Sequence, residues 1–286
     1  MLMMRRRRIE EPPSKLAIWS RRIAIFSLPV VLLAVIIVRS GFLEIVPGLA
    51  TLGGALFLAV IAVVVAFGAL VVIWREGLEG VGFAMTALAI GLLILAYPAY
   101  LAVLGYRLPA IYDVSTDPLD PPRFEAIARL RSRDANPVAY PGLHAADLQR
   151  AAYRDIEPLM VSATPQETYE AALALMTKRK WRVVDARQPQ GKRRDGHIEA
   201  VARTLIMGFR DDVVVRIHPA EDGTRVDMRS ASRYGHHDFG TNASRIRGFL
   251  EDVDDATSNE ERKKQTPKAA KATKSQGKKA HAPARR

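Results

Sequence analysis

The stretch RSASRYGHHDFGTNASR, from Arg229 to Arg245, joins the end of a predicted strand to the start of a predicted helix. The residues that lead into the stretch, and its first residues up to Ser232, alternate between the two faces of a strand, which is the pattern of a half-buried strand. The helix is predicted to start at Thr241 or Asn242. It carries apolar residues at i, i+3, i+4 and i+7, namely Ile246, Phe249, Leu250 and Val253. The stretch therefore predicts where a sheet meets the last helix of a folded domain.

Two strands flank a Glu221-Asp-Gly223 turn just before this stretch. Placing their apolar residues on one face requires Arg216 to lie beside Asp227. Val214 then lies beside Arg229. A slip of one residue would carry Asp227 to the core face, so this register is the one we predict. We expect the Arg216–Asp227 pair to be exposed and to contribute about 0.2–1 kcal/mol.

The rest of the folded domain is predicted over residues 156–255. Strands are expected at 156–161, 181–186 and 198–209. The first helix begins at Thr164, where Thr-Pro-Gln-Glu167 has the spacing of a capping box, with proline at the first helical position. The order strand, helix, four strands, helix predicts an α+β domain, with an antiparallel sheet and two main helices on one face.

Three long apolar runs precede the domain, within residues 23–104. They cover Ile23–Val38, Leu49–Ile73 and Val81–Leu104, and none contains Asp, Glu, Lys, Arg or His. Their lengths predict three transmembrane α-helices. A cleaved signal peptide is the alternative for the first run, but no small-x-small cleavage site follows it. The absence of charge within the spans disfavours transport by this unit alone.

Small residues recur at four-residue spacing in the second and third runs. Examples are Ala55-x3-Ala59, Ala62-x3-Ala66 and Ala87-x3-Gly91. Such spacings allow transmembrane helices to approach closely.

The net charge of +12 is unevenly distributed along the chain. Residues 262–286 contribute +10 and residues 1–22 contribute +5, which leaves −3 for residues 23–261. The folded part is therefore not a basic nucleic-acid-binding body, and no specific nucleic acid is expected as a partner. Seven basic residues precede the first span, whereas the loops carry only Arg39 and Arg75, so residues 1–22 are predicted to stay in the cytoplasm. Three crossings then place the domain in the periplasm.

The tail, residues 256–286, lacks periodicity and is rich in Lys, Ala, Pro and Ser, which predicts disorder. Outside the cytoplasm it would attract anionic lipid head groups. With an inverted topology it would bind nucleic acid nonspecifically. A solvated tail with no dedicated partner is a third reading.

The segment between the last span and the domain, residues 105–155, is rich in proline and aspartate. Asp113, Asp117 and Asp120 lie among four prolines that favour an extended backbone. Calcium binding is one reading of these aspartates. The favoured reading is an extended arm that lies on the folded domain, followed by a short helical piece at 125–133 and then by turns.

The string RSxSR…G…D.G.N..R, with Asp211-Asp212 upstream, resembles the bacterial and plastid family called domain of unknown function 1499. Its residues are Arg229, Ser230, Ser232, Arg233, Gly235, Asp238, Gly240, Asn242 and Arg245, and the resemblance covers roughly 110 to 255. It implies a secreted, lipid-anchored or membrane-anchored protein but no established activity. The chain departs from the commoner pattern at His236-His237, and it lacks the cysteines that some relatives carry.

The same string supplies a candidate ligand site. Arg229 and Arg233 share one side of their strand, and the loop after them leads to a helix N-terminus, which favours anions. We therefore consider a site for a carboxylate or phosphate group, formed by Arg229, Ser230, Ser232, Arg233, Asp238, Asn242 and Arg245.

The alternative is that these arginines pair with aspartates of the same chain and tie the last helix to the sheet. The expected structural partners are Asp211 and Asp212, with Asp238 as a third acid and Arg216–Asp227 as a further pair. Arginine pairs with carboxylates in a forked geometry that suits either reading.

Catalysis and metal binding are weaker readings. A Ser/His/Asp set can be drawn from the Ser230–Asp238 region, but no nucleophile elbow is present, and both serines fall on the core-facing side. The chain has no cysteine, which excludes disulfides and thiolate metal sites. No zinc-binding histidine pattern is present either, so no catalytic residue, metal or cofactor is assigned.

The sequence thus predicts a multi-pass protein of a bacterial inner membrane with a periplasmic α+β domain and a disordered basic tail. Its expected partners are membrane lipids and an anionic envelope component that the domain binds or contacts. An envelope hydrolase is the alternative function.

Overall fold

The computed structural model describes residues 12–41, 45–190 and 194–277, and the side chains up to residue 259. The chain divides into two compact units, which are described separately below. The first contains the residues up to Arg107 with the short segment Leu205–Gly208, and the second contains the rest. Residues 1–11 of the predicted cytoplasmic segment and residues 278–286 of the predicted tail lie outside the described residues.

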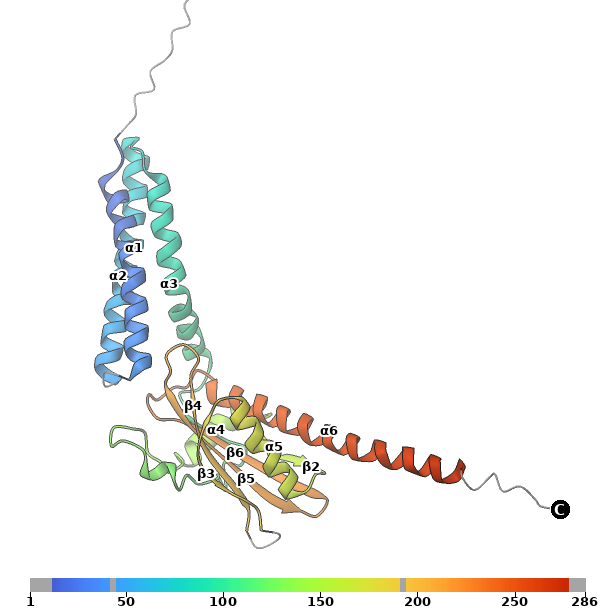
Figure 1. Ribbon diagram of the computed structural model, residues 1–286. Helices are drawn as coiled ribbons and strands as arrows, with labels where there is room; N and C mark the ends of the chain where they lie inside the picture. Colours follow the sequence, from blue (N-terminus) through green and yellow to red (C-terminus); the bar gives the residue numbers. More distant parts are fainter. Residues whose placement is uncertain (1–11, 42–44, 191–193, 278–286) are drawn as a thin grey trace, which may run out of the picture. The chain divides into compact units, whose positions relative to one another are not determined.

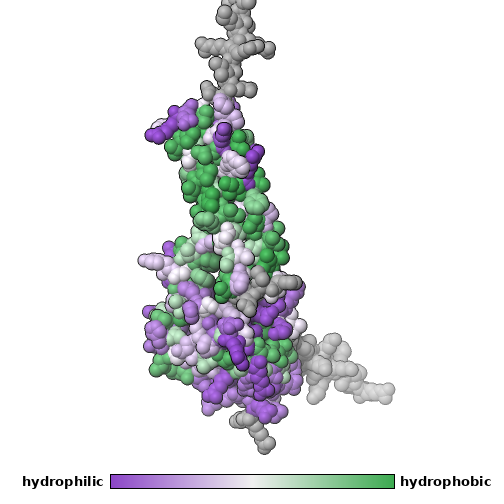
Figure 2. Space-filling view, turned by 90° about the vertical axis from the view of Figure 1, so that its left-hand side faces the viewer, coloured by the Kyte–Doolittle hydropathy of each residue, from purple (hydrophilic) through white to green (hydrophobic). Residues whose placement is uncertain are grey.

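Three long helices precede the folded domain, as the sequence predicts. They are α1 (Lys15–Ser40), α2 (Ile45–Glu76) and α3 (Val81–Arg107) (Figure 1). All three are long and apolar enough to cross a membrane. Each extends beyond the apolar run that predicted it, because the flanking polar residues continue the helix. Hydrophobic residues cover most of the visible face of these helices (Figure 2).

Small residues line the contacts among these helices, which confirms the prediction made from their spacing. The alanines of the three motifs are fully or almost fully buried, at positions 55, 59, 62, 66 and 87. Gly91 is buried as well, and a Cβ built on it would collide with Cγ2 of Val63 and approach the carbonyl oxygen of Ala59 at 3.3 Å. Close backbone approach therefore depends on the absence of a side chain there.

The second unit is built on one antiparallel sheet. Its strands are β1 (Asp113–Ser115), β2 (Leu159–Val161), β3 (Arg182–Arg187), β4 (Gly196–Arg203), β5 (Arg210–Ala220) and β6 (Gly223–Ser232). They run in the order β1-β6-β5-β4-β3, and β2 also pairs with β6. The predicted α+β class and the antiparallel sheet are confirmed.

Two helices cover one face of this sheet, as predicted (Figure 1). α5 (Pro165–Lys178) begins with the expected capping box, in which Thr164 and Glu167 each accept the other's backbone N–H. α6 (Thr241–Gly277) presents the predicted apolar residues Ile246, Phe249, Leu250 and Val253, all of which are buried. They pack with Val213, Val215 and Met228 of the sheet in the main core.

The hairpin register is confirmed, with Arg216 paired with Asp227 and Val214 paired with Arg229. The expectation that the Arg216–Asp227 pair is exposed is wrong. Asp227 is only 1% exposed, because the segment that contains Asp120 lies over this face and Asp120 also bonds Arg216. Both faces of the sheet are therefore covered.

The segment after α3 forms this second cover. We call residues 113–140 the arm. It includes β1 and the short 3-10 helix η1 (Ile127–Arg129), which is smaller than the helical piece expected at 125–133. Phe124 and Ile127 of the arm pack with Val201, Val214 and Ala231 in a second core.

A further helix, α4 (Leu143–Ala152), follows the arm and was not predicted. It is short, and its buried residues are two alanines and Gln149, so it has no apolar stripe from which to infer it.

The last helix is longer than the sequence predicts. α6 continues through residue 256 to Gly277, and Thr257 is buried, with its hydroxyl donating to the carbonyl oxygen of Val253. The Ala, Lys, Glu and Gln of this region have high intrinsic helix propensity, which explains why the helix continues without an apolar stripe.

We predict that Gly91→Ala in full-length protein in detergent lowers the stability of the helical unit by about 1–3 kcal/mol, because the new methyl group overpacks the contact with Val63. Thermal unfolding followed by the helical circular dichroism signal measures the change. Gly68→Ala is the matched control, because Gly68 lies in α2 and its new methyl group would meet no atom within 4 Å. Equal melting temperatures for the two variants would contradict the packing described here.

Candidate functional site

The seven residues of the candidate ligand site lie in β6, in the turn that follows it and in the first turns of α6. Arg229 faces the arm, and Arg233, just past the end of β6, shares Asp212 with Arg131 of the arm. Ser230 and Ser232 face α6, where they meet Asn242 and Arg245. The structure therefore forms two polar clusters instead of one, because successive side chains of a strand point to opposite faces.

Arg229 is the centre of the cluster on the arm face. Its guanidinium forms a forked pair with Asp113 of β1, at 2.9 Å from Nε to Oδ1 and 2.7 Å from Nη2 to Oδ2. It also donates to the carbonyl oxygens of Pro122 and Val138. Its charge lies over the ring of Phe124, 4.6 Å from the centroid. Every one of these partners belongs to the arm.

The pair is buried, since the side chains of Arg229 and Asp113 are 3% and 0% exposed. Burial raises the pKa of the Asp113 carboxyl, and the hydrogen bonds and charge of Arg229 oppose this shift. An external anion would have to displace Asp113 to reach Arg229. The geometry thus favours the reading in which the arginine pairs within the chain, with an aspartate that the sequence did not single out for it.

Arg233 pairs with Asp212, which was one of its expected partners. Nε and Nη2 of Arg233 donate to Oδ1 of Asp212 at 2.9 and 2.7 Å. The other oxygen, Oδ2, accepts from Nε of Arg131 at 2.7 Å. Because Arg131 also donates to the carbonyl oxygens of Asn136 and Pro137, this second cluster again joins the sheet to the arm.

Two further aspartates of the arm, Asp117 and Asp120, repeat the same contact farther along the sheet. Asp117 accepts from Arg225 at 2.7 Å, and Asp120 accepts from Arg216 at 2.8 Å. Asp117 also accepts the N–H groups of Leu119 and Asp120 in a local turn. The aspartates at 113, 117 and 120 therefore each bond one sheet arginine, which agrees with the extended-arm reading.

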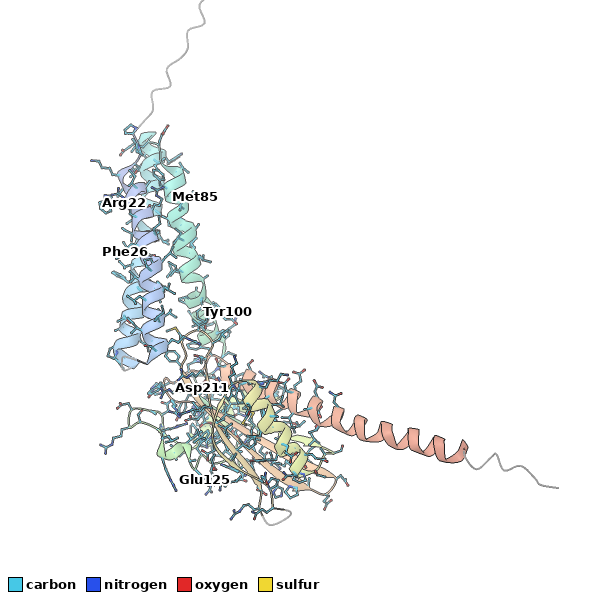
Figure 3. All side chains as sticks on the ribbon, viewed as in Figure 1. Arg22, Phe26, Met85, Tyr100, Glu125 and Asp211 are labelled. Carbon is cyan, nitrogen blue, oxygen red and sulfur yellow. The ribbon has the colours of Figure 1, made fainter. Side chains whose placement is uncertain are left out.

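The cluster on the helix face ties α6 to β6. The hydroxyl of Ser230 donates to Oδ1 of Asn242 at 2.7 Å, and Arg245 donates to both. Arg245 also pairs with Asp211, which is 2% exposed and whose pKa burial raises against the opposing charge of Arg245. The amide of Asn242 donates to Oγ of Ser232 and to the carbonyl oxygen of Tyr112. Figure 3 labels Asp211 within the sheet.

Asp238 occupies the position that an external anion was expected to take. Its carboxylate accepts the N–H groups of Gly240 at 3.0 Å and Asn242 at 2.8 Å, so it satisfies the start of α6. Burial raises the pKa of Asp238, and these two hydrogen bonds oppose the shift.

The residues of the alternative hydrolase site do not form a relay among the residues described. Ser230 bonds Asn242 and Arg245, and no histidine contacts its hydroxyl. His237 instead hydrogen-bonds the carbonyl oxygen of Leu108 and accepts the N–H of Phe239. Nucleophilic catalysis needs a serine within hydrogen-bond reach of a base, so this arrangement offers no activated serine.

Glu199 forms a further polar cluster that the sequence did not indicate. It is 0% exposed and accepts the N–H groups of Glu125, Ala126 and Ile127 at 2.7–3.0 Å, which caps η1. Nε2 of His197 lies 2.9 Å from Oε1 of Glu199. Burial opposes the charged form, but the bonds from His197 and the three N–H groups lower the pKa of Glu199 below its ordinary value.

Ligand atoms of Asp185, His197 and Glu199 lie within 4.8 Å of one another, which is a spacing that suits a metal ion. However, the Glu199 oxygens already accept four hydrogen bonds, and Asp185 pairs with Arg187. The donor set is therefore engaged in fixing the arm to the sheet. The one signal in the sequence is the acid itself, which interrupts the otherwise apolar strand Ile198–Ala202.

The profile of the family described as "Protein of unknown function (DUF1499)" matches residues 113–253. Residues 113–253 form a domain of the DUF1499 family. The match begins at Asp113, the partner of Arg229, and it ends at Val253, the last core residue of the predicted helix face. No curated protein and no solved structure matches the chain.

The structure shows what the residues that carried the resemblance to DUF1499 contact. Arg229 and Arg233 hold the arm, whereas Ser230, Asn242 and Arg245 hold α6. Gly235 and Gly240 both have positive φ, at +83° and +78°, which allows the tight loop between β6 and α6.

We predict that Glu199→Gln destabilises the domain by about 2–3 kcal/mol at neutral pH, because a buried charged acceptor of several N–H groups is lost. Since the folded pKa of Glu199 is lowered, its contribution is fully present above the unfolded pKa, about 4.3, and is lost as the pH falls through the folded pKa. The difference between the wild type and Glu199→Gln should therefore shrink in acid.

Urea unfolding of the full-length protein in detergent measures this difference. With Trp19 and Trp74 replaced by phenylalanine, Trp181 is the sole tryptophan, and it stacks on Phe249 in the core. Glu125→Gln is the matched control, because Glu125 is an exposed acid of the same arm turn, labelled in Figure 3, and its loss should cost less than about 1 kcal/mol. Equal losses for the two variants would contradict the role given to Glu199.

Proposed function

We propose that this protein is a three-span protein of a bacterial inner membrane that holds its DUF1499 domain in the periplasm. The domain serves, without catalysis, as a binding or structural module for an anionic component of the envelope. The orientation is supported by the basic residues, seven of which lie in residues 1–22, whereas the last turns of α1 and α2, where the chain leaves these helices, carry only Arg39 and Arg75.

The observation that carries this proposal is the direct connection between the third candidate span and the sheet. α3 ends at Arg107, and β1 begins at Asp113. The residues between them are held in place: Ile111 is buried, and the carbonyl oxygen of Tyr112 accepts the N–H of Ser232 at 2.8 Å. A domain without a flexible linker stays within reach of the membrane surface, so its partner should be found there.

A binding or structural role is supported over catalysis by the engagement of the polar side chains. The candidate arginines and serines all contact carboxylates, amides or backbone groups of the same chain. The anionic nature of the partner is supported by residues 262–286, which contain ten Lys or Arg and no acid. Near an anionic surface, each such charge contributes about 1 kcal/mol to attraction.

Cysteine labelling of the full-length protein in spheroplasts tests the proposed orientation, because the native chain contains no cysteine. Asp222→Cys lies in the exposed β5–β6 turn of the domain, and Glu76→Cys lies at the end of α2. We expect a membrane-impermeant maleimide to label Asp222→Cys in intact spheroplasts, and to label Glu76→Cys only after permeabilisation.

The reverse labelling pattern would contradict a periplasmic domain and would support the inverted topology, in which the basic tail can meet nucleic acid. Labelling of both positions after permeabilisation is the control for reactivity.

A further inference from the structure

The turn between β4 and β5 is apolar and exposed, which is unusual for a hairpin turn. It reads Thr204-Leu-Ile-Met-Gly-Phe209. Leu205 is 89% exposed, and Ile206 is 40% exposed. An exposed group of large apolar side chains at the tip of a folded domain commonly marks a contact surface.

Hydrogen bonds between its first and last residues hold this turn together. The N–H of Thr204 donates to the carbonyl oxygen of Phe209 at 2.9 Å, and the N–H of Phe209 donates to Oγ1 of Thr204 at 2.9 Å. Gly208 has φ +70°, which completes the reversal. The fold therefore presents the side chains of residues 205–207 at its tip.

Two exposed arginines flank the tip. Arg203 ends β4, Arg210 begins β5, and the two are direct partners in the register of these strands. Like charges directly opposite each other destabilise a strand pair. Within the described part of the chain, neither guanidinium lies within ion-pair distance of a carboxylate, in contrast to Arg229 and Arg233. Such a pair is well suited to bind phosphate groups.

The sheet register places this tip at the end of the sheet where the chain arrives from α3. β1 is antiparallel to β6, with Asp113 beside Ala231, so residues 108–112 meet the sheet where β6 ends. In the same register, Ser232 of β6 lies beside Asp211, next to Arg210 and the tip. Residues 108–112 therefore enter the sheet at the same end as the tip.

We propose that the tip formed by Leu205, Ile206 and Met207 inserts into the interface of the lipid bilayer, and that Arg203 and Arg210 bind the phosphates of anionic phospholipids. Exposed apolar side chains with cationic side chains next to them are the combination that binds such an interface. Under this proposal, anionic phospholipids are the anionic partner that the proposed function assigns to the domain. It rests on the membrane anchoring in that function, but not on which side of the membrane the domain lies.

Fluorescence of a labelled tip tests the proposal in the full-length chain. Leu205→Cys is labelled with an environment-sensitive nitrobenzoxadiazole probe, and the protein is reconstituted into vesicles of phosphatidylcholine and phosphatidylglycerol. We expect emission at shorter wavelength than from the same probe at a solvent-exposed position, and a loss of intensity when doxyl-labelled phosphatidylcholine is included. Iodide in the buffer should quench this probe weakly.

The matched control is Asp222→Cys, because the β5–β6 turn lies at the opposite end of the same sheet. Its probe should be quenched by iodide and not by doxyl lipid. Equal iodide quenching of the two probes would overturn the proposal. A blue-shifted Leu205→Cys probe that doxyl lipid does not quench would also overturn it, because protein would then cover the tip.

A second comparison tests the role of the arginines. Arg203→Gln with Arg210→Gln should reduce the doxyl quenching of the Leu205→Cys probe in vesicles containing phosphatidylglycerol to the level found in phosphatidylcholine alone. Unchanged quenching would overturn the assignment of these arginines to anionic lipid. A domain on the cytoplasmic side in cells would contradict the proposed function but would leave both of these outcomes unaltered.

Discussion

The buried pair between Arg229 and Asp113 is the contact on which the rest of the domain depends. Asp113 lies in β1, six positions after the end of α3, and Arg229 lies in β6, the strand that also pairs with β2 and β5. Around this pair the arm places Phe124, Pro122 and Val138 against the same guanidinium. Burying a single charge is costly, so the arginine and the arm can be buried only together.

This constraint gives the DUF1499 signature a physical meaning. Alternate residues of one strand serve two interfaces: Arg229 and Arg233 join the sheet to the arm, and Ser230 and Ser232 join it to α6. The same strand thus connects the segment that follows the last candidate span with the last helix. The polar residues that resemble a ligand site are the contacts that hold these layers together, and for this reason we propose the exposed end of the sheet as the surface for an external partner.

The sequence predicted the features that depend on local pattern. The capping box at Thr164 and the register of Arg216 with Asp227 follow from short-range rules, and both are present. The partner of Arg229 could not be predicted, because Asp113 lies 116 residues away and several aspartates are equally suitable in sequence. The reading of one sheet face as exposed failed for the same reason: the arm that covers it is irregular, and Glu199 is buried beneath it.

The most direct test of this account is a double-mutant cycle of Asp113→Asn and Arg229→Met in the full-length protein, with the free energy of unfolding measured by urea. Each single change leaves one buried polar group without its partner, and should cost about 3–5 kcal/mol. The double variant should cost clearly less than the sum, with a coupling energy of at least about 2 kcal/mol. Additive losses would show that the two residues act independently, and would contradict the central role given to their pair.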